Sequence, residues 1–109
     1  MRNFNIQKIE TRRKSGQTTY GVVFTEGVIN TENFKIYELS IKHGFYNYPC
    51  LVNQLISMRY PNDVMQAIIN NYLLDKDDPQ ILAEFNEMQE WRKDCKAFAK
   101  VLLENKPKI

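Results

Sequence analysis

The stretch from Pro79 to Glu104 most constrains what this chain can fold into, because after Pro79 it contains neither Gly nor Pro. Asp78 is a suitable N-cap, and Pro79 suits the first position of a helix, where no backbone donor is needed. At about 100° per residue the apolar side chains fall within an arc of roughly 140°. They are Ile81, Phe85, Met88, Trp91, Cys95, Phe98, Ala99 and Leu102. The sequence therefore predicts one long helix with a core-facing stripe.

Two shorter helices are predicted before it, over residues 49–58 and 61–74, and Pro61 separates them. In the second, the residues expected to face inward are Val64, Met65, Ile68, Ile69 and Tyr72. The acidic turn at residues 75–78 is short, so this helix and the long helix should be antiparallel neighbours.

The N-terminal part is typical of a β-hairpin. Residues 18–25 alternate apolar and other side chains as a strand does, whereas residues 3–11 place Phe4 and Ile6 in step and Ile9 out of step, as a strand with a bulge would. The polar residues 12–17 are expected to form an exposed loop between the two strands.

Residues 28–43 allow two interpretations. Val28 and Ile29 can start a short third strand. Residues 31–43 can continue as a strand, since their apolar residues alternate, or form a helix capped by Thr31 and ended by Gly44. We favour the helix, because both of its ends carry the expected residues.

We thus expect a single α+β domain over residues 1–109, with a hairpin and mixed segment at about 3–43 and a helical part at about 49–104. An apolar fraction of 43% can supply one core, and a net charge of +2 is too small to indicate a polyanionic partner. No apolar run is long enough to span a membrane, and the N-terminus lacks the apolar centre of a signal peptide, so a cytoplasmic protein is expected.

Catalytic and metal-binding motifs are not visible. His43 is the single histidine, and no nucleophile elbow or phosphate-binding glycine loop is present. Cys50 and Cys95 each lie next to apolar residues and are expected to be buried thiols, and the acidic turn at 75–78 is better explained as a helix cap than as a calcium loop. We therefore expect no enzyme activity, no cofactor and no metal.

Nucleic acid is a possible partner on two grounds. Arg12, Arg13 and Lys14 could contact phosphates, although a solvated turn is the favoured interpretation. Residues 36–58 resemble a helix-turn-helix of the arabinose-regulator kind, although the second helix carries neither Arg nor Lys at its reading positions. The small, turn and apolar positions would be Ser40, Gly44, Phe45, Leu51 and Leu55.

The second half of the chain, Leu51 to Lys100, resembles small uncharacterised proteins of bacterial prophages and mobile elements. The residues that carry the resemblance are Arg59, Tyr60, Asp63, Glu84, Phe85, Gln89, Trp91, Arg92, Cys95, Lys96 and Lys100. The resemblance implies a phage-related setting without an assigned activity.

A long helix of about 39 Å beside a neighbour of about 21 Å leaves roughly half of its stripe to be covered by the hairpin or by a second copy of the chain. Aromatic and arginine side chains are favoured interface anchors, so Trp91, Arg92 and Phe98 are candidate interaction residues, unless Trp91 packs on the chain's own hairpin. We expect a protein that acts through protein–protein interaction, as a homo-oligomer. The alternative is a DNA-binding regulator that uses residues 36–58 with Arg12, Arg13 and Lys14.

Overall fold

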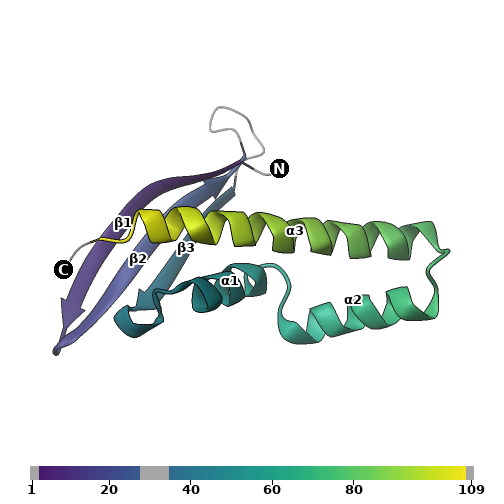
Figure 1. Ribbon diagram of the computed structural model, residues 1–109, viewed down its shortest axis with the longest axis horizontal. Coiled ribbons are helices and arrows are strands. Elements are labelled where there is room, and N and C mark those ends of the chain that lie inside the picture. Colours follow the sequence, from purple (N-terminus) through teal and green to yellow (C-terminus); the bar gives the residue numbers. More distant parts are fainter. Residues whose placement is uncertain (1–2, 28–34, 108–109) are drawn as a thin grey trace.

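The structure, a computed structural model, describes residues 3–27 and 35–107 and is an α+β domain (Figure 1). A three-stranded antiparallel sheet comes first and three helices follow, which confirms the expected fold class. The elements are β1 (Phe4–Lys14), β2 (Gln17–Glu26), β3 (Lys35–Lys42), the 3-10 helix η1 (His43–Phe45), α1 (Tyr48–Ser57), α2 (Asn62–Leu74) and α3 (Pro79–Glu104). The strand predicted at residues 28–29 lies outside the described residues.

The sheet has the order β1-β2-β3, and its first hairpin is longer than predicted. The pairing of β1 with β2 shifts register between Ile6 and Lys8, which confirms the predicted bulge. The prediction of an exposed loop over residues 12–17 is wrong, because β1 continues to Lys14 and β2 begins at Gln17. Ser15 and Gly16 alone make the turn, with φ of 54° and 77°, and two such left-handed residues match the twist of a hairpin.

The helix favoured for residues 31–43 is wrong, since residues 35–42 form strand β3. Leu39 and Ile41 are buried, whereas Glu38 and Ser40 are exposed, so the segment alternates with the period of a strand. Pairing with β2 fixes that alternation, and this non-local contact outweighs the helix-ending residues nearby. The first helix of the suggested helix-turn-helix is therefore absent.

Helix α3 has the predicted boundaries and cap. The carboxylate of Asp78 accepts hydrogen bonds from the backbone N–H groups of Gln80 (2.9 Å) and Ile81 (3.4 Å). The second half of α3 lies across the sheet with α1 alongside it, and the first half pairs with α2, antiparallel as predicted (Figure 1). The sheet thus supplies the cover that α2 is too short to provide.

The core lies between the sheet, α1 and the second half of α3, and the molecule extends well beyond it. Buried side chains from all three meet there, and the phenol of Tyr46 donates a hydrogen bond of 2.7 Å to the backbone oxygen of Leu102. The radius of gyration is 16.1 Å, whereas a compact chain of this length has about 13 Å. The excess comes from α2 and the first half of α3, which project past the sheet and are called the arm below (Figure 1).

None of the described helices combines the length and the apolar content that a bilayer span requires.

Candidate protein-binding surfaces

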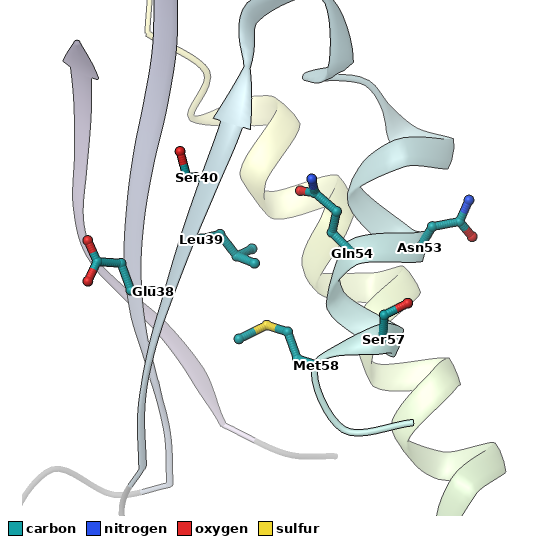
Figure 2. A pocket seen from close by; sticks show the side chains of 7 residues that line it. All are labelled: Glu38, Leu39, Ser40, Asn53, Gln54, Ser57 and Met58. Atoms are coloured by element: carbon teal, nitrogen blue, oxygen red, sulfur yellow. The ribbon is translucent and has the colours of Figure 1, made fainter. Parts of the chain in front are cut away.

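A groove with a volume of about 430 Å³ separates strand β3 from helix α1 (Figure 2). It is lined by Glu38, Leu39, Ser40, Asn53, Gln54, Ser57 and Met58. Among the described strands, β3 pairs with β2 alone, so the groove follows an edge of the sheet.

Local sequence signals set α1 beside this edge. The short η1 turn joins β3 to α1, and the side chain of Asn47 caps α1 by accepting a hydrogen bond of 3.1 Å from the N–H of Cys50. Leu51 and Leu55 are buried, so the opposite, polar side of α1 is directed outward. A capped amphipathic helix in this position forms the second wall of the groove.

Some side chains that line the groove point into it and others point away from it (Figure 2). Leu39 extends from β3 toward α1, and Gln54 and Met58 extend from α1 toward β3. Glu38 and Ser40 point away from α1, yet they still line the groove. Three consecutive strand residues can line one groove only along the backbone edge, because successive side chains alternate between the two faces.

Gln54 carries an unusual polar atom for such a position. Its side-chain oxygen Oε1 is buried and has no hydrogen-bond partner. Because buried acceptors are nearly always paired in native proteins, an unpaired one beside a groove indicates a place where a donor can bind. Sequence reasoning missed this residue, since the groove exists only when β3 is a strand.

A second hollow of about 300 Å³ lies between α1, the start of α2 and Arg92 of α3, and it shares Asn53 and Ser57 with the groove. It is lined by Asn53, Ile56, Ser57, Asn62, Met65 and Arg92. The guanidinium Nη1 of Arg92 donates a long hydrogen bond of 3.4 Å to Gln89, whereas its Nε is buried without an acceptor. Of the predicted trio Trp91, Arg92 and Phe98, Arg92 thus lines this hollow, and Phe98 lines a smaller one of about 140 Å³ between β1 and α3.

Trp91 and Phe98 are core residues, with exposed fractions of 1% and 4%. Phe4 from β1 packs edge-on against the ring of Trp91 with a centroid distance of 5.6 Å. The guanidinium of Arg59 lies 5.2 Å from the same ring, and Phe24 from β2 covers Phe98. In this fold Trp91 therefore packs on the chain's own hairpin, and neither aromatic ring is available to a partner.

The basic residues at the hairpin end do not form one cluster. Arg12 turns back over the outer face of the sheet, where its guanidinium lies 3.0 Å from a Glu10 oxygen and 3.7 Å from a Glu38 oxygen. A Cβ at Gly21 would approach this guanidinium to 3.0 Å, so the glycine leaves room for it. Lys8 also pairs with Glu10, and Lys8 and then Arg12 hold the pKa of Glu10 below its usual value.

Alternation along β1 places Arg12 and Lys14 on one face of the sheet and Arg13 on the other. The side chains of Arg12, Arg13 and Lys14 therefore do not converge on one surface. In addition, Arg12 is already paired with the carboxylates of Glu10 and Glu38.

The end of the arm exposes apolar side chains. Leu73 and Leu74, the last residues of α2, are 62% and 85% exposed, and Leu82 in the first turn of α3 is 40% exposed. Tyr72 and Phe85 stack beside them with ring centroids 3.9 Å apart. Two consecutive leucines outside the apolar stripe, directly before a turn, are the sequence signal that would have indicated this surface.

One of the residues predicted to face inward on α2 does not: Val64 is 40% exposed. Ile68 is the single fully buried residue of α2. The helix therefore buries a narrow stripe, which is what contact with one neighbouring helix allows.

His43 and the cysteines have structural surroundings. A hydrogen bond of 2.8 Å joins Nδ1 of His43 to the hydroxyl of Tyr20. Cys95 is buried as predicted, and Cys50 is half-buried. Within residues 3–27 and 35–107, no three His, Cys, Asp or Glu side chains are arranged to hold a metal ion.

Comparison of the chain with models of protein families, with curated proteins and with solved structures finds no match. Function is therefore inferred from the geometry of the chain itself.

Proposed function

We propose that this chain is a non-enzymatic protein that acts by binding protein, and that its arm pairs with the arm of a second copy to form a homodimer. The observation that carries the proposal is the exposure of Leu73, Leu74 and Leu82 at the end of a projecting helical hairpin. Scattered single leucines on a surface are ordinary, but here three gather around one turn.

The arm has unused apolar surface because it is only two helices thick. Burial of a leucine side chain contributes roughly 1.5–3 kcal/mol, so covering these residues would stabilise the chain appreciably. A second arm related by two-fold symmetry presents the same leucines, and two antiparallel helix pairs can associate as a four-helix bundle. Self-complementarity is why a second copy is the partner that we propose.

The setting of this function, a bacterial prophage or mobile element, is proposed from the resemblance of residues 51–100 alone.

The proposal is tested by adding charge to the arm. In the double variant Leu73→Glu/Leu74→Glu, sedimentation velocity across a concentration series should show association at least about tenfold weaker than in the unaltered chain. The matched control is Ile36→Glu on β3, because Ile36 is an apolar residue of similar exposure (66%) outside the arm.

Helix content by circular dichroism should be the same in all three proteins, since every substituted side chain is exposed. Equal association of the double variant and the unaltered chain, or association that only Ile36→Glu weakens, would contradict pairing through the arm.

A further inference from the structure

We propose that β3 and α1 form a docking groove for an extended segment of a partner protein, which adds to the sheet as a fourth strand beside β3. The groove lies on the sheet, away from the arm, so this inference goes beyond self-association and does not depend on it.

The edge of β3 can form further backbone hydrogen bonds. Every second residue of an edge strand directs its N–H and C=O groups away from the sheet. Since β3 pairs with β2 alone among the described strands, those groups line the groove beside Glu38, Leu39 and Ser40. An extended peptide backbone presents donors and acceptors at the matching spacing, which is the basis of peptide recognition by strand addition.

The opposite wall of the groove carries an unpaired acceptor. Gln54 extends from α1 toward β3, and its Oε1 lacks a donor. The terminal torsion of a glutamine side chain is soft, so a small rotation can turn this oxygen toward an incoming N–H group. A segment in the groove would thus be bonded from β3 on one side and from Gln54 on the other.

Between its polar walls the groove contains apolar side chains. Leu39 and Met58 extend into it from opposite sides (Figure 2). Methionine side chains adapt readily to differently shaped neighbours, so an apolar residue of the segment can pack between these two. Alternating side chains of a strand would direct the next residue toward the outer face, near the carboxylate of Glu38. The segment favoured is therefore one that alternates apolar residues with basic or neutral polar residues.

A single segment fits this groove better than the β3 edge of a second copy. Helix α1 forms the outer wall, and a second sheet edge would bring its own α1 into the same space. In addition, antiparallel pairing of two β3 strands in full overlap would place Lys35 of one copy opposite Lys42 of the other, and like charges opposite each other are destabilising.

The experiment uses a synthetic peptide as long as β3, 8 residues, that alternates Val with Thr and carries Lys in place of one central Thr, where it can approach Glu38. Backbone pairing depends little on side-chain identity, so a generic peptide should bind. Amide hydrogen exchange of the full chain is measured with and without this peptide. The outward-facing amides of β3 should exchange at least about tenfold more slowly when the peptide is bound.

A second peptide with the same side chains, N-methylated at every residue so that neither of its edges can donate a backbone hydrogen bond, separates backbone pairing from simple apolar contact. It should give no protection of β3. Equal protection by both peptides, protection located away from β3, or no protection at the solubility limit of the first peptide would each overturn the proposal.

The variant Gln54→Leu tests the second wall. It keeps the size of the side chain and removes the acceptor, so the affinity for the first peptide should fall by about fivefold or more. Gln66→Leu is the matched control, because Gln66 is an exposed glutamine of α2 that does not line the groove. An unchanged affinity of Gln54→Leu for the first peptide would show that Gln54 does not bind the peptide.

Discussion

At the scale of single residues, Gln54 shows how a binding surface can conflict with stability. A buried acceptor without a donor costs about 1–3 kcal/mol, and replacing it by an apolar group of similar shape removes that cost. A side chain that lowers stability in the free chain and gains a partner on binding is typical of functional sites.

We therefore predict that Gln54→Leu raises the free energy of unfolding by about 1 kcal/mol, measured by urea denaturation. Asn53→Leu, at an exposed neighbouring position, should change it by less than about 0.5 kcal/mol. A Gln54→Leu variant less stable than the unaltered chain would show that the carboxamide is bonded in solution.

Tyr46 gives a prediction about pH. Burial, and then the neighbouring Tyr20, raises the pKa of Tyr46 from 10.0 to about 12. At a pH between these two pKa values, the tyrosine of the unfolded chain loses a proton that Tyr46 keeps in the folded chain. The free energy of unfolding therefore falls as pH rises. The stability that the raised pKa of Tyr46 contributes is complete below pH 10 and is lost by about pH 12. The total loss across this range is about 2–3 kcal/mol.

The variant Tyr46→Phe isolates this effect. It should lose about 1 kcal/mol at neutral pH, because the backbone oxygen of Leu102 loses one of its two donors and keeps the N–H of Asn105. Its stability should then fall less steeply above pH 10 than that of the unaltered chain, measured by urea denaturation at several pH values. Identical slopes in the two proteins would contradict a raised pKa at Tyr46.

At the scale of elements, the cap of α3 is a local device whose contribution can be measured. Asp78→Ala should lower the free energy of unfolding by about 1 kcal/mol, because two N–H groups of the first turn lose their acceptor. Asp77→Ala is the control, since Asp77 is an exposed residue of the same turn and not the N-cap. Equal losses in the two variants would show that the general charge of the turn, and not the cap, is responsible.

Elements with local signals could be predicted from the sequence, and those set by distant contacts could not. The cap and Pro79 locate the start of α3, and its apolar stripe predicts the buried side chains. For residues 31–43 the local signals of Thr31 and Gly44 predict a helix, whereas pairing with β2 makes residues 35–42 a strand. No local pattern shows which strand a segment will meet.

The same distinction applies to the candidate site. Trp91 and Phe98 have the chemistry of interface anchors, but the sequence alone does not tell whether a partner or the chain's own sheet covers them. Here the sheet covers both. The groove at β3 could not be predicted, for the same reason as β3 itself. The leucines at the end of the arm can be recognised in the sequence as apolar residues outside the stripe.

At the scale of the whole molecule, the chain has two parts with different packing. The body places α1 and half of α3 on a sheet and buries Tyr20, Phe24 and Trp91, whereas the arm is a helical hairpin that leaves leucines exposed. We propose a different kind of contact for each part: a second copy at the arm and an extended segment at the edge of the sheet.

The central claim is that the arms of two copies pair, and isotope-filtered NMR tests it most directly. A sample that mixes labelled and unlabelled chains reports only contacts between different copies. The account predicts such contacts at the methyl groups of Leu73, Leu74 and Leu82. Contacts between copies at other surfaces, or none in a concentrated sample, would contradict it.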